Sequence, residues 1–237
     1  EEIVLAPGAE PAADPNLVLR VAVAAAEFGL PIAPGTLRNL KKCPIGDRNW
    51  TDESRELFIR LLASGPALLN VWEDIDFIDV PGKLIPEWLG VRNRPSASAA
   101  HRYTIDRHMV EVVTRLGRET PSGGRYDDRH YEALLLAGIL HDIGKRPGVA
   151  NHAAEGARHA TVVVERMGFD RDIVRWVTLL VREHLTLSEF ATGRNPNDPN
   201  VGDDLAGRLD HNPVLLDMLF DLTRADGSSL GATSGET

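Results

Sequence analysis

Apolar residues recur along this chain at the three- and four-residue intervals of an amphipathic helix, and polar residues, proline and glycine interrupt them. No stretch of useful length alternates apolar and polar positions as a half-buried β-strand does. We find no internal repeat and no low-complexity tract. We therefore predict an all-α fold, with helices over residues 15–28, 51–64, 68–73, 104–117, 128–143, 151–168, 170–184 and 213–226.

Local signals mark several of the helix ends. Asp14-Pro15 predicts an N-cap followed by proline at the first helical position, and Gly29 predicts the end of that helix. Thr51 opens the next helix, which has acidic residues in its first turn and stops at Gly65. The segment EFATGRNPNDPNVG at 189–202 is rich in Asn, Pro and Gly and predicts a loop.

The length of 237 residues accommodates one or two domains with a sizeable core. Prolines at positions 81, 86 and 95 separate short apolar runs and provide the best candidate for a boundary. We expect a small N-terminal helical extension over residues 1–95 and a larger helical bundle over residues 96–237.

Composition narrows the class of protein. Hydrophobic residues make up 43% of the chain and the formal net charge is −9, which argues against general nucleic-acid binding, although a local basic patch stays compatible. The single cysteine, Cys43, excludes a disulfide framework and a zinc ribbon and favours the cytoplasm. No apolar run approaches the ~18 residues of a membrane span, and no signal peptide is visible. The chain lacks an initiator methionine, so we expect an excised fragment.

The stretch LLLAGILHDIGKRPG, at 134–148, carries the strongest chemical signal. Its apolar helix runs directly into His141-Asp142, and adjacent residues on a helix point about 100° apart. Both side chains reach one point only near a helix end, which we expect Gly144 to provide. An imidazole beside a carboxylate can bind a divalent metal. The plain alternative, a histidine placed for the helix dipole, leaves the aspartate in an apolar helix without a partner.

Other polar residues interrupt apolar helical faces. His108 lies in YTIDRHMVEVV, and Asp226 ends the last apolar helix. Lys145 follows the His-Asp pair by one turn, as either a phosphoryl-binding cation or a solvated one. The remaining histidines and two candidate substrate-binding arginines are weaker cases: we interpret His101, His130, His159 and His211 as structural or exposed, and surface charge is the first reading of Arg182 and Arg194.

A histidine, a His-Asp pair and a distant aspartate, all on helices, resemble the HD phosphohydrolase superfamily. Five ordered blocks resemble more closely the HD domain of the PII uridylyltransferase/uridylyl-removing enzymes, together with the helical linker before it, in its actinobacterial form. Asn151 stands where that family usually has Asp. We see neither the nucleotidyltransferase motif nor ACT domains, so the resemblance concerns the HD part. The blocks are HRYTIDRH (101–108), AGILHDIGK (137–145), NHAAEG (151–156), VREHL (181–185) and LTRAD (222–226).

This resemblance implies an HD-domain helical bundle and a metal-dependent phosphodiesterase that removes a nucleotidyl group, UMP or AMP, from a tyrosine of the PII signalling protein. It implies one or two divalent ions (Mn, Mg or Fe) and nucleotidylated PII as the partner, with neither nucleic acid nor membrane. The implied roles are metal ligation for His108, His141, Asp142 and Asp226, catalysis for Lys145, His152 and His184, and substrate binding for Arg182 and Arg194.

Two alternatives stay open at this point. An HD-family hydrolase of small nucleotides would share the metal ligands, but the flanking motifs of those families are not visible here. A non-catalytic regulatory HD module would bind metal or nucleotide without hydrolysis. The oligomeric state is not determined by the sequence.

Overall fold

A computed structural model describes residues 1–45, 50–96, 103–120, 124–195 and 198–229. The predicted all-α fold is confirmed: the described residues contain no β-strand, only isolated bridges between Ile3 and Ile32 and between Pro95 and Thr104. The first half holds η1 (Pro11–Ala13), α1 (Leu17–Phe28), α2 (Pro34–Leu40), α3 (Asp52–Leu62), α4 (Ala67–Phe77), α5 (Val80–Leu84) and η2 (Pro86–Gly90). The second half holds α6 (Ile105–Glu119), α7 (Asp128–Leu140), α8 (His152–Arg166), α9 (Arg171–Glu183), α10 (Thr186–Gly193), α11 (Pro199–Arg208) and α12 (Pro213–Ser229).

Capping residues explain where the helices begin. The Thr51 side chain accepts from the Ser54 backbone N–H while Ser54 accepts from the Thr51 backbone, so the start of α3 is a reciprocal capping box. The predicted start of the first helix was two residues early. Asp14 accepts from the backbone N–H of Asn16 and forms a turn of its own, so α1 begins only at Leu17. Gly29 ends α1 with φ of 63°, as predicted.

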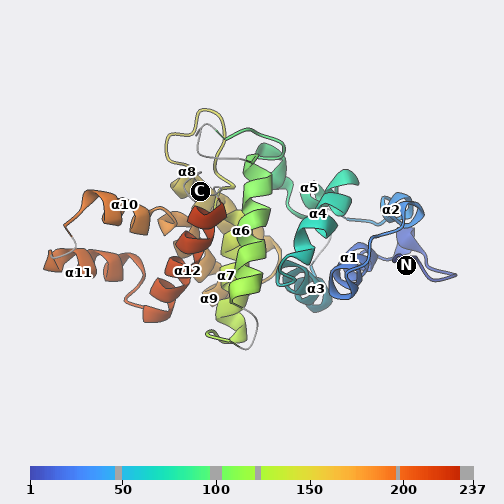
Figure 1. Ribbon diagram of the computed structural model, residues 1–237, viewed down its shortest axis with the longest axis horizontal. Coiled ribbons are helices and arrows are strands. Elements are labelled where there is room, and N and C mark those ends of the chain that lie inside the picture. Colours follow the sequence, from blue (N-terminus) through green and yellow to red (C-terminus); the bar gives the residue numbers. More distant parts are fainter. Residues whose placement is uncertain (46–49, 97–102, 121–123, 196–197, 230–237) are drawn as a thin grey trace, which may run out of the picture.

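The helices form a bundle around α6, which lies between the N-terminal helices and the rest of the chain (Figure 1). α7 packs against α6 and α9, α8 packs against α9, and α12 closes the bundle against α6 and α7. α10 and α11 project from the far end (Figure 1). This arrangement brings the C-terminal end of α12 back to α6, so residues far apart in sequence meet in the bundle.

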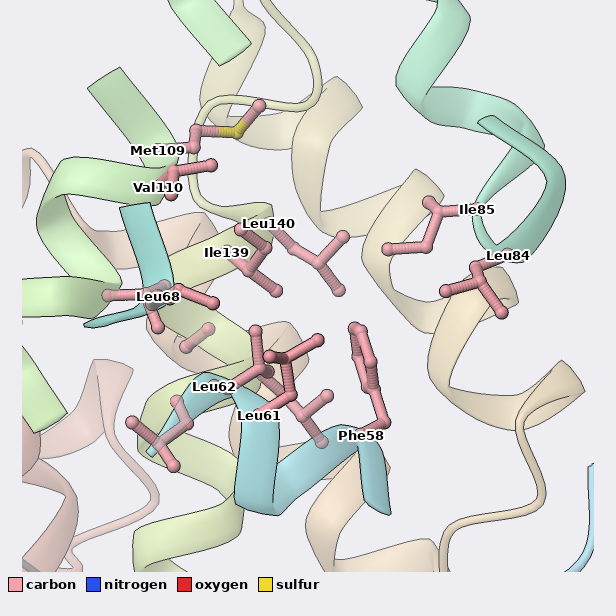
Figure 2. Close-up of a cluster of buried hydrophobic side chains, with 14 of the residues drawn as sticks. Phe58, Leu61, Leu62, Leu68, Leu84, Ile85, Met109, Val110, Ile139 and Leu140 are labelled. Carbon is pink, nitrogen blue, oxygen red and sulfur yellow. The ribbon is translucent and has the colours of Figure 1, made fainter. Parts of the chain in front are cut away.

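One hydrophobic core joins the N-terminal helices to the bundle. Phe58 and Leu61 of α3 lie in the same buried cluster as Ile139 and Leu140 of α7, and Ile85 lies beside η2 in that cluster (Figure 2). α3 and α4 also pack directly against α6. The apolar body of α7 is therefore covered on its outer side by the N-terminal helices, while its polar end faces the interior of the bundle. The boundary near residue 95 stays a prediction.

The predicted loop over 189–202 was wrong for most of its length, because α10 extends to Gly193 and α11 starts at Pro199. Asp198 caps α11 by accepting from the backbone N–H of Asn200, so Asp198-Pro199 marks a helix start. Prolines also occupy the first helical positions of α2, α5 and η2. Among the described residues, no helix is long and apolar enough to cross a membrane.

Candidate metal centre

The end of α7 delivers His141 and Asp142 into the core, with exposed fractions of 0% and 1%. His141 is the C-cap of α7, and its Nδ1 lies 2.8 Å from the carbonyl oxygen of Gly138, one turn back. A carbonyl only accepts, so Nδ1 donates to it and Nε2 is left with its lone pair. The tautomer of His141 is therefore set by the main chain of its own helix.

Gly144 allows two backbone segments to pack closely, and it does not adopt the left-handed conformation with which a glycine often ends a helix. Its φ is not positive, and α7 ends at Leu140 with His141 as the C-cap, so the expected helix end at Gly144 was placed too late. A Cβ added at Gly144 would lie 2.2 Å from the carbonyl oxygen of His152 and 2.4 Å from the nitrogen of Gly156. The absence of a side chain therefore lets the turn after α7 press against the first turn of α8, which carries His152.

His108 and Asp226 reach the same place from α6 and α12. The Nε2 atom of His108 lies 2.9 Å from Oδ1 of Asp226 and 3.3 Å from Nε2 of His141. His108 is 2% exposed, and the Asp226 side chain is 20% exposed. His108, His141 and Asp226 thus form one group, here called the inner group, whose ligand atoms lie within 4.8 Å of one another.

A second group, here called the outer group, consists of Asp142, His152 and His184, with ligand atoms that also lie within 4.8 Å of one another. His152 is the first residue of α8, and Asn151 caps that helix by accepting from the backbone N–H of Ala154. His184 is the C-cap of α9, and its Nδ1 lies 2.7 Å from the carbonyl oxygen of Val181.

Asp142 connects the two groups. Its Oδ2 lies 3.5 Å from Nε2 of His141 and 3.8 Å from Nε2 of His108. Its Oδ1 lies 3.5 Å from Nε2 of His184 and 3.8 Å from Nε2 of His152. One carboxylate therefore faces each group with a different oxygen, a geometry suited to a ligand shared by two ions.

The donor set fits divalent metals. Asp142 Oδ1, His152 Nε2 and His184 Nε2 are buried and have no hydrogen-bond partner in the described part of the chain. An unsatisfied buried polar atom is costly, and a metal ion would satisfy all three of these atoms at once. Nitrogen and carboxylate oxygen donors together suit transition-metal ions such as iron or zinc, while a carboxylate also serves manganese or magnesium.

The charge environment differs across the cluster. Complete burial lowers the pKa of His141 to about 4, and burial also lowers the pKa of His152. Burial alone would raise the pKa of Asp142, but His141, His184 and Lys145 outweigh it and hold that pKa well below its ordinary value. The imidazoles of His141 and His152 are therefore neutral near pH 7 and Asp142 is ionised, which are the protonation states of metal ligands.

The candidates outside the two groups have protein partners of their own. Lys145 Nζ lies 2.6 Å from Asp142 Oδ2, so it contacts the cluster directly. Arg182 donates to Glu183 at 3.0 Å, and it lines a shallow groove on the outer faces of α8 and α9 that contains none of the six cluster residues. Arg194 pairs with Asp204 at 2.8 Å. The structure therefore brings Lys145 to the site and gives neither arginine a contact with the two groups.

The other histidines have ordinary contacts. His130 stacks on Trp176 with ring centroids 4.1 Å apart, and His159 lies 2.9 Å from a carboxylate oxygen of Glu155. His211 lies in the turn before α12 with φ of 55°, and His101 lies outside the described residues. Sequence reasoning missed Ser229, whose Oγ lies 2.9 Å from Nδ1 of His108. The serine stands three residues after Asp226 on α12, and that spacing was its only signal in the sequence.

An all-α bundle that brings His108, the His141-Asp142 pair and Asp226 together has the arrangement that the resemblance to the HD superfamily implies. The chain is 38% identical to a bifunctional uridylyltransferase/uridylyl-removing enzyme of Mycobacterium tuberculosis over 97% of its own length and 28% of the relative. The enzyme of the same name from Streptomyces coelicolor is also 38% identical, over 97% of this chain and 27% of the relative. The one from Caulobacter vibrioides is 34% identical over 73% of this chain.

No family model matches the chain. It spans less than a third of the length of the curated relatives from Mycobacterium and Streptomyces. The chain is therefore a homologue of one part of the bifunctional uridylyltransferase/uridylyl-removing enzymes, which confirms the resemblance that its motifs indicate.

Proposed function

We propose that this chain is a hydrolase that removes a nucleotidyl group, UMP or AMP, from a tyrosine of the PII signalling protein, as a metal-dependent phosphodiesterase. The name of these relatives includes uridylyl removal, which is a hydrolytic activity. The observation that carries the proposal is the pair of His/Asp groups joined by Asp142. Two divalent ions held by these neighbouring groups would supply the charge that assists displacement of one oxygen by another at phosphorus.

The six cluster residues would hold the metal. His108, His141 and Asp226 would hold one ion, and His152 and His184 a second, with Asp142 shared between the two. A bound divalent ion supplies Lewis-acid polarisation of the phosphoryl oxygens and lowers the pKa of a water molecule toward neutrality. The protein fixes the directions of these ligands, because the tautomers of His141 and His184 are held by main-chain carbonyls.

The hydrolysis forms a bond from a water oxygen to phosphorus and breaks the bond from phosphorus to the tyrosine oxygen. The tyrosine leaves as a phenolate and then takes up a proton, since its ordinary pKa is about 10. Lys145 lies beside Asp142 and is 23% exposed, so its ammonium group would offset negative charge on the phosphoryl oxygens. His152, at 27% exposed, stands at the more accessible side of the cluster.

The deciding experiment is incubation of the chain with nucleotidylated PII and Mn²⁺, followed by intact-mass analysis of PII. We expect PII to lose the mass of one nucleotidyl group, and we expect EDTA or the Asp142→Ala change to prevent that loss. A model phosphodiester such as bis(p-nitrophenyl) phosphate, assayed in parallel, separates the alternatives. Cleavage of the model ester with intact nucleotidyl-PII would indicate a different nucleotide substrate. Mn²⁺ binding without either hydrolysis would indicate a regulatory module.

Several finer predictions belong to this proposal. The metal is Mn, Mg or Fe, the protein acts in the cytoplasm, and Arg182 and Arg194 contact the substrate. For the two arginines, contact with substrate would require release from Glu183 and Asp204, which now pair with them. Replacement of either arginine by Ala should raise KM for nucleotidylated PII while leaving hydrolysis of the model ester unchanged.

A further inference from the structure

The imidazoles of His108, His141 and His184 are oriented by a hydrogen bond at Nδ1, but the acceptors differ. His141 and His184 use main-chain carbonyl oxygens one turn back on their own helices. His108 uses a side chain, the hydroxyl of Ser229, at 2.9 Å and from a different helix. A main-chain acceptor cannot be removed by substitution, whereas a serine hydroxyl can. Ser229 is thus the one of these three supports that a mutation can test.

The two contacts of the Ser229 hydroxyl place a proton on Nδ1 of His108. A serine hydroxyl has one hydrogen and can accept with its lone pairs. That hydrogen goes to the carbonyl oxygen of Asp226, 2.8 Å away. The contact with Nδ1 of His108 therefore needs the hydroxyl oxygen as acceptor and an N–H on His108 as donor. Ser229 is 1% exposed, so water does not compete for either bond.

The same side chain also braces the carboxylate ligand of this group. Ser229 is bonded to the backbone of Asp226, whose Oδ1 lies 2.9 Å from Nε2 of His108. Two residues of α12 therefore contact the same imidazole: the Asp226 carboxylate faces Nε2 of His108, and the Ser229 hydroxyl contacts Nδ1. Rotation of the His108 ring would break both of these contacts.

We propose that Ser229 is a positioning residue that holds a proton on Nδ1 of His108 and so leaves Nε2, which faces Asp226, as the atom that would bind a metal ion in the inner group. The inference rests on the proposed metal-binding role of that group. Partners that orient metal-bound histidines typically change metal affinity or activity by 10- to 100-fold when they are removed. We therefore expect Ser229→Ala to weaken Mn²⁺ binding about 10-fold or more without altering the fold.

The neighbouring serine provides a matched control. Ser228 is exposed, bonds only to the carbonyl oxygen of Ala225 among the described residues, and does not touch His108. Ser228→Ala removes the same atom from the same turn of α12. It should bind Mn²⁺ as the wild type does, and far-UV circular dichroism and thermal unfolding of both variants check that the fold is retained.

The first readout is Mn²⁺ affinity, measured by titration calorimetry on the wild type and both variants. The second needs no metal: ¹⁵N-labelled protein with assigned histidines should show a hydrogen-bonded, slowly exchanging Nδ1–H for His108, His141 and His184. In Ser229→Ala the His108 signal alone should be lost or shifted. Wild-type affinity in Ser229→Ala, an equal loss in Ser228→Ala, or an unprotonated His108 Nδ1 in the wild type would each overturn the proposal.

The two readouts separate this inference from the proposed function. A wild-type chain that binds no Mn²⁺ would contradict the metal site, while the Nδ1–H signal would still report whether Ser229 orients His108. A wild-type chain that binds Mn²⁺ and is indifferent to Ser229→Ala would retain the metal site and contradict the role of the serine.

Discussion

The ends of α7 and α9 have the same local construction. Each helix has a histidine as its C-cap, and each histidine bonds through Nδ1 to the carbonyl oxygen three residues earlier. Yet the pKa of His141 is lowered to about 4, whereas the pKa of His184 is raised. Burial lowers both, but at His184 the negative charge of Asp142, whose Oδ1 lies 3.5 Å from Nε2, together with the Val181 carbonyl and Asp226, outweighs burial. Tertiary neighbours, and not the shared helix-end geometry, therefore set the proton affinity of each imidazole.

The two helix ends are also braced differently. After α7, Arg146 donates to the carbonyl oxygen of Glu87 in η2 at 2.7 Å. At the end of α9, Glu183 accepts from Thr186 at 2.7 Å and from Arg208 at 3.3 Å. One brace ties the site to the N-terminal helices, and the other ties it to the projecting α10–α11 segment. Substitutions at these two helix ends should therefore affect metal binding by the inner and outer groups differently.

We expect the largest effect from a variant that removes Asp142, the residue that the inner and outer groups share. The double change His141→Ala and Asp142→Ala takes a ligand from the inner group and the oxygen pair that both groups use. We expect no stoichiometric metal in this variant, measured by elemental analysis, and an α-helical far-UV spectrum. Retained metal would show that Asp142 does not connect the two groups.

Single changes at the two C-caps should separate the groups. We expect His184→Ala to keep one metal ion and to lose hydrolysis of nucleotidyl-tyrosine by about 100-fold or more, because a direct ligand should matter at least as much as an outer partner. His141→Ala should lose the ion of the inner group. Metal content and activity are measured on the same preparation. Wild-type activity in His184→Ala would return that histidine to a structural role.

Gly144, in the turn after α7, should tolerate replacement by alanine less well than a glycine in an open position elsewhere in the chain. Gly144→Ala places a Cβ within 2.5 Å of backbone atoms of α8, which cannot move without displacing His152. We expect the free energy of unfolding to fall by about 3 kcal/mol, measured by urea denaturation. The control is Gly193→Ala, because a Cβ at Gly193 meets no atom within 4 Å. Equal stability of the two variants would show that the turn can adjust.

We expect the smallest effect at a second contact of η2 with the bundle. The Glu87 carboxylate accepts two hydrogen bonds from Arg166 of α8, at 2.6 and 2.9 Å. Burial would raise the pKa of Glu87, but the hydrogen bond from Arg166 outweighs it and the pKa is lowered. A lowered carboxylate pKa stabilises the fold above the unfolded value, near pH 4.3, and that stability is lost as pH falls through the folded value. Glu87→Gln should therefore remove less than about 1 kcal/mol at pH 7 and nothing near pH 2. An equal loss at both pH values would contradict an ionic origin.

The sequence contains enough to predict most of the longer helices and the residues of the two groups, but not α2, α5, α10 or α11. Thr51, Asp127 and Asp170 sit at helix starts and cap them with their side chains, so local chemistry sets those ends. The order of the motifs in the chain identified the six cluster residues, although only tertiary packing brings them together. The choice between helix and loop failed where proline begins a helix, since proline favours both outcomes.

Contacts between distant side chains were beyond prediction from sequence. Arg194 pairs with Asp204 because helix packing places these two side chains together. Ser229 showed no apolar-face or motif signal that would tie it to His108, which lies in another helix. A hydrogen bond between residues 121 positions apart leaves no periodic trace in the chain.

The large separation in sequence between His108 and α12 also affects the order in which the site is assembled. Synthesis runs from the N-terminus, so α6 to α9 exist before α12 has been made, and contacts that are distant in sequence tend to form late in folding. Until α12 docks, His108 has neither Asp226 nor Ser229 beside it. The inner group is therefore completed by one of the last described segments to leave the ribosome. A nascent chain would be expected to acquire its full ion-binding capacity only after its bundle has otherwise closed.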